Sequence, residues 1–381
     1  MNKKPHIGLI LALMMFPQIV ETIYSPVLPH LARSFDISVN TAAQTLSIYF
    51  SAFAVGVIFW GRIADLIGRR TTMLIGLCTY GLGSILALTA TDFNMIMVAR
   101  FMSAFGAAVG SVVTQTMLRD SYKGDELVKV FTLMGMGISL SPVIGLISGG
   151  IIADLSGYVG VFSVLLILAI ILYLVALNAL PETRPDNIAK VSLLTLLVRM
   201  LKDSRIRYNA MLVALFNLVL FSYYSLAPFI FSHFGFSSIE FGYTGIALAC
   251  GSLLGSLLNK RLLQTKCTSQ SLLRLACGLV LLGSSGVYMT QDSVWLLVPM
   301  LIVVMSYGIA IPNILAHALT HYKDVAGSAG AVFGLMYYLL LGAGLAITGL
   351  LNNLGLVLIL AAIIIFGCTY QLNTSKPAKQ H

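Results

Sequence analysis

Long apolar stretches separated by short polar connections dominate the chain. Each stretch is close to the roughly 20 residues that an α-helix needs to cross the hydrocarbon core of a bilayer, at about 1.5 Å per residue. The pattern therefore predicts an all-α membrane protein with twelve transmembrane helices. The predicted helices lie near residues 7–30, 41–61, 71–90, 94–117, 128–153, 158–180, 208–231, 240–259, 271–290, 294–316, 327–349 and 351–372.

The longest polar connection divides the predicted helices into two sets of six. We expect an N-terminal six-helix bundle at residues 1–181, a cytoplasmic linker at 182–207 and a C-terminal six-helix bundle at 208–381. The two halves also share a weak sequence echo. The segment FWGRIADLIGRR after the second helix is echoed by LLGSLLNKRLLQ after the eighth. This echo predicts two pseudo-repeat bundles.

Composition and charge agree with a membrane protein. The 381 residues are 58% hydrophobic and only 10% charged, whereas an ordinary soluble domain has roughly a quarter charged residues. If both termini are cytoplasmic, all Lys and Arg except Arg33 and Arg100 fall on the cytoplasmic side. This positive-inside bias predicts a multi-pass protein of the bacterial cytoplasmic (inner) membrane with both termini in the cytoplasm. The net charge of +9 then reflects topology beside membrane lipids, and we expect no nucleic-acid partner.

Two opposite charges lie well inside the predicted helices. Glu21 is the one acid at such a position and Arg100 the one base. A buried carboxylate costs several kcal/mol unless it faces an aqueous cavity or is protonated. Counted from the outer helix ends, the two residues lie about 14 and 9 Å deep, so they can share one level. We predict that Glu21 and Arg100 couple proton movement to transport, and a permanent structural ion pair remains the alternative.

Other polar and aromatic positions are candidates for a substrate cavity. Tyr24 lies one helical turn from Glu21, and three positions of the seventh helix recur at intervals of four and three residues, which places them on one face. Packing between helices is the alternative interpretation for each aromatic residue. The candidate cavity residues are Tyr24, Gln44, Gln115, Asn217, Phe221, Tyr224, Ser306 and Asn313.

Histidines at the end of the tenth helix have the spacing of a metal pair. His317 and His321 are four residues apart, but no third ligand is evident in the sequence. Their position also complements the negative end of a helix, so we expect no metal site. The chain has no Gly-Lys-Ser/Thr loop for nucleotide phosphates and no Ser-His-Asp set. We therefore expect no cofactor, with a proton as the coupling ion.

Several motifs resemble those of the major facilitator superfamily. GRIADLIGRR follows the second helix, with Leu66 where the family usually has Arg. ARFMSAFGAAVGS places Arg100 where the family has its intramembrane Arg, and LPETR closes the sixth helix. SPVIGLISGG resembles the antiporter motif, with Ser141 and Leu146 at two of its glycine positions. LRDSYKGDE and HYKDVAGSAGAVFG resemble the Bcr/CflA drug-resistance branch.

The resemblance implies roles for two groups of residues. A loop that closes the inner gate would include Gly61, Asp65, Gly68, Arg69 and Arg70. In it, Asp65 would face a helix end of the other half, and the arginines would pair with nearby acids. A small-residue face associated with antiport would include Ser141, Pro142, Gly145, Gly149 and Gly150.

The function that this resemblance implies is proton-coupled transport of small molecules by alternating access, most specifically efflux of drugs and amphiphiles. A proton-linked transporter of metabolites or siderophores is the first alternative. A membrane-embedded enzyme or sensor is the alternative from another class, and it would need a cluster of catalytic groups that the sequence does not contain. We expect a small-molecule substrate and no obligate protein partner.

Overall fold

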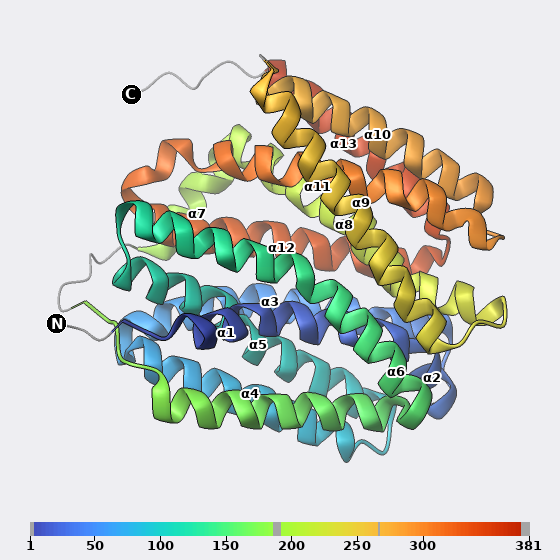
Figure 1. The fold of residues 1–381 in the computed structure, drawn as a ribbon, viewed down its shortest axis with the longest axis horizontal. Helices are drawn as coiled ribbons and strands as arrows, with labels where there is room; N and C mark the ends of the chain where they lie inside the picture. The colour runs from blue at the N-terminus through green and yellow to red at the C-terminus, as the bar shows by residue number, and fades with distance from the viewer. Residues whose placement is uncertain (1–3, 186–191, 266, 375–381) are drawn as a thin grey trace. The chain divides into compact units, whose positions relative to one another are not determined.

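The computed structural model describes residues 4–185, 192–265 and 267–374, and this part of the chain is helical and contains no β-strand (Figure 1). The all-helical prediction is therefore confirmed. The elements are α1 Ile7–Ile23, η1 Ser25–Val27, α2 Leu28–Ser34, α3 Val39–Ile67, α4 Arg69–Leu88, α5 Phe93–Ser121, α6 Gly124–Ala179, α7 Leu193–Lys202, α8 Ser204–His233, α9 Ser238–Gln264, α10 Ser269–Thr290, η2 Val294–Leu296, α11 Leu297–Ala318, η3 Thr320–Val325, α12 Ala326–Leu351 and α13 Leu354–Thr374.

Eleven helices within the described ranges are long and apolar enough to cross a membrane. One of them, α6, has 56 residues, which is about 84 Å at helical rise and nearly three times the thickness of a hydrocarbon core. It therefore contains the fifth and sixth predicted helices. Their junction is Gly157, with φ 59° and ψ −152°, and it lies within the short connection expected between residues 153 and 158. Glycine adopts this conformation without a steric penalty.

Local sequence explains where several helices begin. The side chains of Ser38 and Asp92 accept hydrogen bonds from backbone N–H groups three residues along, at 3.2 and 3.0 Å, and so cap α3 and α5. In the first span, Pro26 and Pro29 follow α1 closely. Proline has no backbone N–H to continue a helix, and the span is divided there into α1, η1 and α2.

Close helix packing in the first half depends on small residues. In this half, α5 contacts α1, α3 and α4. A Cβ atom added to Gly76 would overlap Val109, and one added to Gly106 would overlap the backbone of Tyr80. Small residues let the backbones of membrane helices approach this closely. Arg100, which is on α5, is thereby fixed relative to the neighbouring helices.

The chain groups into two compact units. One comprises Met1–Lys190 with Phe231–Gly245, and the other comprises Val191–Ile230 with Ile246–His381. The predicted domain boundaries at 181 and 208 remain a prediction, and part of the predicted linker, residues 186–191, lies outside the described residues.

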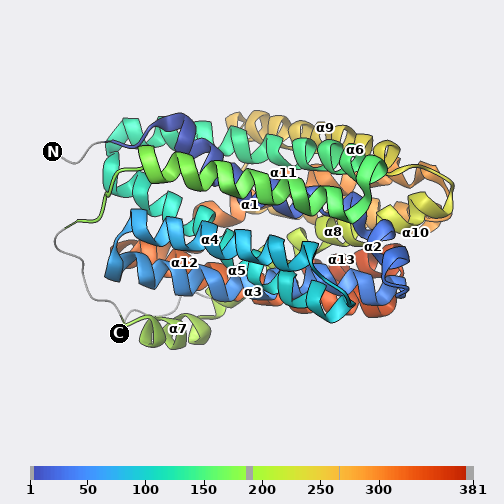
Figure 2. The same cartoon turned by 90° about the horizontal axis from the view of Figure 1, so that it is seen from below.

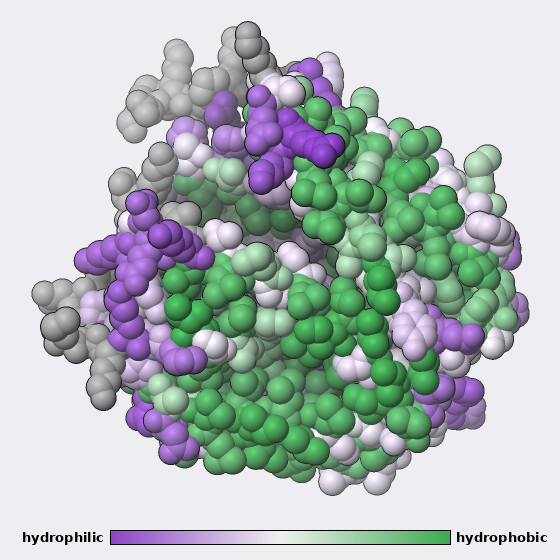
Figure 3. All heavy atoms as spheres, in the orientation of Figure 1, coloured by the Kyte–Doolittle hydropathy of each residue, from purple (hydrophilic) through white to green (hydrophobic). Residues whose placement is uncertain are grey.

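The linker also contains a helix that was not predicted. Figure 2 shows α7 as a short element beside long ones. Its Leu196 and Met200 are buried, whereas Leu194 is 72% exposed. Many other large apolar side chains are exposed on the long helices, among them Leu155, Ile171 and Leu282, and green covers much of the face in Figure 3. An apolar surface of this extent suits contact with lipid.

Candidate functional site

A buried arginine in contact with two tyrosine rings forms the centre of the candidate site. Arg100 projects from α5 and is 1% exposed. Its guanidinium carbon lies 3.8 Å from the ring centroid of Tyr24 and 4.4 Å from that of Tyr49. Cation–π attraction of this kind stabilises a guanidinium that has lost its water. Tyr24 ends α1, and Tyr49 lies on α3, so three elements hold the arginine.

Glu21 lies one turn before Tyr24 and is 5% exposed. No ion pair among the described residues joins it to Arg100. We call Glu21, Tyr24, Tyr49 and Arg100 the arginine–tyrosine cluster. Its sequence-predicted members are Glu21, Tyr24 and Arg100, whereas Tyr49 was not predicted.

Polar atoms of this cluster lack hydrogen-bond partners among the described residues. They are Oε1 of Glu21, the hydroxyls of Tyr24 and Tyr49, and Nε and Nη1 of Arg100. A buried polar atom without a partner costs about 1–3 kcal/mol, so a folded protein retains several together only for a reason. Water, a proton or the polar groups of a ligand would satisfy them. Such a cluster would allow the Glu21 carboxyl to take up and release a proton, and the Arg100 guanidinium to donate hydrogen bonds to a ligand.

The predicted glutamines lie on the helices that carry Arg100 and Tyr49, at other levels along them. Gln115 lies fifteen residues after Arg100 on the same helix, which is about 22 Å at helical rise. Gln44 lies near the start of α3, one turn and a half before Tyr49, and it is half-buried. Their predicted role in a cavity remains a prediction.

The second unit has its own polar and aromatic group. Asn217 on α8 donates to the carbonyl of Val213 at 2.8 Å and accepts a hydrogen bond from the Tyr307 hydroxyl at 3.3 Å. The rings of Phe221 and Tyr224 lie edge to face, with centroids 5.4 Å apart. The three predicted positions of α8 are thus accompanied by Tyr307 of α11, which was not predicted.

Ser306 and Asn313 make other contacts. The Ser306 hydroxyl donates to the carbonyl of Val303 within its own helix, at 2.6 Å. The amide of Asn313 donates to Oδ1 of Asn259 at 2.6 Å and to the carbonyl of Ile309 at 2.8 Å. Asn259 is the residue that the sequence echo aligns with Asp65. The described structure therefore shows Asn313 as a link between α11 and α9.

The predicted gate loop is held by charges of its own unit. Nη1 of Arg69 lies 3.0 Å from the Asp65 carboxylate, and its Nε lies 2.9 Å from that of Asp120. Arg69 is 3% exposed and also donates to the carbonyl of Ala64 at 2.8 Å. Arg70 instead donates to the carbonyl of Leu177 at 2.7 Å. The expected pairing of Arg69 with nearby acids is present.

Glu182, of the sequence LPETR, completes this network. Its carboxylate accepts hydrogen bonds from the backbone N–H groups of Arg69 and Arg70, at 2.8 and 3.1 Å. These are the first two residues of α4, and the positive end of a helix favours an anion there. Gly68 precedes them with φ 102°, and a Cβ atom at this position would overlap the carboxylate. We call Asp65, Arg69, Asp120 and Glu182 the loop network.

The glycines of the predicted antiport motif lie at close helix contacts. A Cβ atom added to Gly145 would overlap the Thr22 side chain, and one added to Gly149 would overlap the backbone of Ile23. Both contacts join α6 to α1 directly beside Glu21. The hydroxyl of Ser141, the residue before Pro142, donates to the carbonyl of Gly137 at 2.9 Å. The small-residue face thus positions the helix that carries the predicted coupling carboxylate.

Gly150 makes a different contact, because a Cβ atom there would overlap the carbonyl of Ser238.

His317 binds the Ser269 hydroxyl at 3.1 Å. In the ranges that the structure describes, no three His, Cys, Asp or Glu residues are grouped to hold a metal ion.

Comparisons with known proteins agree with the helical arrangement. The family model described as Major Facilitator Superfamily matches residues 10–346. An uncharacterized transporter of Rickettsia bellii is 32% identical over 353 residues, which cover 88% of this chain and 87% of that protein. Multidrug resistance protein D of Escherichia coli is 26% identical over 389 residues and 98% of each chain.

A bicyclomycin resistance protein homolog of Haemophilus influenzae is 24% identical over 343 residues, covering 84% of this chain and 83% of its own. Among solved structures, a bacterial homologue of the human lysosomal transporter Spinster has a TM-score of 0.71 at 14% identity. The similarity covers 98% of both chains and concerns the fold alone.

Proposed function

Because the chain belongs to the Major Facilitator Superfamily, we propose that it exports amphiphilic small molecules in exchange for protons. Membership makes the chain a multi-pass membrane transporter of small molecules and not an enzyme, and it confirms the resemblance of the motifs. The enzyme and sensor alternative is therefore set aside. The names of the relatives from Escherichia coli and Haemophilus influenzae refer to drug resistance, and this supports the choice of substrate class.

The observation that carries the coupling proposal is the unsatisfied Glu21 beside a stacked Arg100. Oε1 of Glu21 has no hydrogen-bond partner among the described residues. No hydrogen bond from a described residue therefore stabilises a negative charge on this oxygen. Protonation removes the charge, and access to water restores it. A carboxyl group that is neutral when buried and charged when hydrated can bind a proton when it faces one side of the membrane and release it when it faces the other. Alternating access of two six-helix bundles would supply that change of surroundings.

The proposed cycle assigns a function to each group. Glu21 carries the proton, Arg100 sets the local field, and the faces of the two tyrosine rings hold the Arg100 guanidinium. The loop network fixes the end of α3 against the start of α4, which would allow the loop to act as a rigid part of an inner gate. We place the protein in the inner membrane of a bacterium with both termini in the cytoplasm, on the strength of the positive-inside bias.

A second candidate function is transport of a carboxylate-bearing metabolite or siderophore. Arg100 favours it, because its Nε and Nη1 lack hydrogen-bond partners and a guanidinium binds carboxylates strongly. The two candidates predict substrates of opposite charge.

Purified protein in proteoliposomes with an imposed pH gradient distinguishes them. The panel contains a lipophilic cationic dye, a neutral amphiphile and a dicarboxylate. We expect proton-driven movement of the dye or the amphiphile. Movement of the dicarboxylate alone would replace efflux of amphiphiles with the second function. Substrate movement that is independent of the pH gradient would contradict proton coupling.

A further inference from the structure

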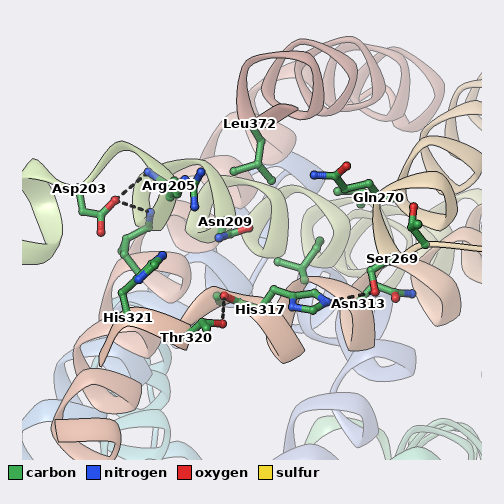
Figure 4. A pocket seen from close by; sticks show the side chains of 15 residues that line it. Asp203, Arg205, Asn209, Ser269, Gln270, Asn313, His317, Thr320, His321 and Leu372 are labelled. Atoms are coloured by element: carbon green, nitrogen blue, oxygen red, sulfur yellow. Dashed lines mark hydrogen bonds between the residues drawn. The ribbon is translucent and has the colours of Figure 1, made fainter. Parts of the chain in front are cut away.

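A pocket at one end of the second unit carries a separate proposal. It has a volume of about 540 Å³ and is formed by the first residues of α8 and α10 and the last residues of α11 and α13 (Figure 4). Every residue that lines it belongs to the same compact unit. It shares none of the residues of the arginine–tyrosine cluster or the loop network.

Two long helices begin at this pocket. Asp203 caps α8, since its Oδ1 accepts from the backbone N–H of Arg205 at 2.9 Å. Thr268 caps α10 by accepting from the backbone N–H of Ser271 at 3.2 Å. Helix N-termini carry partial positive charge and favour anions.

The side chains around the two helix starts add hydrogen-bond donors. Arg205 projects from the first turn of α8, His317 from the last turn of α11 and His321 from η3 (Figure 4). The one carboxylate among the described lining residues is Asp203. Both of its oxygens are engaged, because Oδ2 accepts from the Tyr322 hydroxyl at 3.2 Å. The lining therefore offers more donors than acceptors.

A buried amide in the pocket gives independent evidence for a ligand. Asn209 is 8% exposed and lies one turn along α8 from Arg205, and Figure 4 shows its amide directed into the pocket. No described residue forms a hydrogen bond with that amide. Its N–H donors are therefore open to the pocket, and a bound oxyanion would accept hydrogen bonds from them.

The start of α4 in the first unit offers a comparison for the start of α10. There α4 begins against the Glu182 carboxylate, which binds the first two backbone N–H groups. In the order of long helices, α10 is the counterpart of α4 in the second half. None of the described carboxylates accepts a hydrogen bond at Ser269 or Gln270, the first residues of α10. An external anion can take the position that the chain itself fills in the first unit.

The geometry points to a binding site for a phosphate group in this pocket. A phosphate can accept several hydrogen bonds at once, which matches a guanidinium, imidazoles, an amide and the start of α10. The volume exceeds that of inorganic phosphate, and Leu273, Ile314 and Leu372 add apolar walls. The phosphate can therefore belong to a free phosphorylated compound or to a lipid headgroup. The site is independent of the proposed efflux function.

The test uses the full-length protein in neutral detergent, without a transport assay. Binding of radiolabelled inorganic phosphate is measured at constant ionic strength, and binding of phosphatidylglycerol is measured against phosphatidylcholine in mixed micelles. We expect saturable phosphate binding if the ligand is a free compound, and selective phosphatidylglycerol binding if it is a lipid. Absence of both overturns the proposal.

Substitutions locate the binding. Arg205→Gln combined with His317→Gln should weaken phosphate or phosphatidylglycerol binding at least tenfold. The matched control is Arg274→Gln, which removes one charge from an exposed position on α10 outside the pocket. An equal loss in the control would show that general surface charge, and not the pocket, attracts the anion, and it would overturn the assignment.

A third variant guards against misfolding. Asn209→Asp keeps the size of the side chain and puts a negative charge where the phosphate would lie. It should abolish phosphate binding while the thermal transition of the ligand-free protein stays within a few degrees of wild type. Undiminished binding in this variant would also overturn the proposal.

Discussion

The arginine–tyrosine cluster and the loop network differ in how completely their polar atoms are paired. Both belong to the first unit and each contains a buried arginine. Arg69 has two carboxylates within 3.0 Å and a backbone carbonyl at 2.8 Å. Arg100 lies over the ring faces of Tyr24 and Tyr49, but its Nε and Nη1 lack hydrogen-bond partners among the described residues. The same type of side chain thus has charged and polar partners in the loop network but retains polar atoms without partners in the arginine–tyrosine cluster.

This difference in pairing predicts that the loop network contributes mainly to folding stability and the arginine–tyrosine cluster mainly to binding. A fully paired buried network loses much when one member is removed, because the remaining charges are stranded. A cluster with unsatisfied atoms already bears that cost, so a change there should affect folding less and ligand or proton binding more. Substitutions in the two groups should therefore have opposite profiles, and four predictions test this contrast.

The largest effect is expected for Glu21→Gln. The amide resembles the protonated acid in size and hydrogen bonding but cannot release a proton. Transport driven by a pH gradient in proteoliposomes should fall to the rate of protein-free vesicles, with the thermal transition little changed. Glu126→Gln is the control, because Glu126 forms an exposed pair with Lys4 and such pairs contribute little. Active transport near the wild-type rate with an unchanged pH profile would contradict the coupling role.

The second effect concerns folding. Arg69→Ala strands Asp120, whose side chain is only 13% exposed, and should lower the free energy of unfolding by about 3 kcal/mol, or roughly a hundredfold in equilibrium constant. Unfolding by denaturant in mixed micelles measures it. Arg62→Ala is the control, since Arg62 is exposed and makes no ion pair among the described residues. A similar loss in both variants would show that the loop network does not stabilise the fold.

The third prediction, of about tenfold, concerns the sign of the substrate. Arg100→Ala should preserve binding of a lipophilic cationic dye better than Glu21→Ala, because deprotonated Glu21 attracts the cation directly. Equilibrium binding of the dye and of a dicarboxylate to both variants measures this. Loss of dicarboxylate binding in Arg100→Ala, with no dye binding even in wild type, would favour the metabolite or siderophore function.

Sequence patterns predicted the helices and the charged members of the cluster for clear physical reasons. A charge within an apolar stretch is rare, so Glu21 and Arg100 stand out without any structure. Tyr49 does not, because its helix contains other aromatic residues such as Phe50 and Phe53. The two helices of α6 were predicted, and the junction between them, Gly157, lies in the connection expected between residues 153 and 158.

Contacts between distant residues were the least predictable feature. Glu182 reaches the start of α4 across more than a hundred residues of sequence, and no local pattern specifies that contact. Asn313 was predicted to line a cavity from its polar character, and it lies in the wall of the pocket in the second unit, but its hydrogen bond to Asn259 of a neighbouring helix was not predicted. The linker helix α7 was missed because its amphipathic turns lie within a stretch that is polar on average.

The smallest expected effect is that of Asp65→Asn. The Asp65 side chain is 35% exposed and pairs with Arg69 across the junction of α3 and α4, at 3.0 Å. Partly exposed pairs contribute at most about 1 kcal/mol, and Arg69 keeps Asp120 as a partner. If the loop belongs to the gate, the rate of substrate exchange should change by about three- to fivefold while equilibrium binding stays the same. Exchange across proteoliposomes and binding in detergent measure the two quantities separately. A loss of binding with unchanged exchange would place Asp65 with the ligand and remove the basis for a gate, because the paired network would then be doing what we assign to the unpaired cluster.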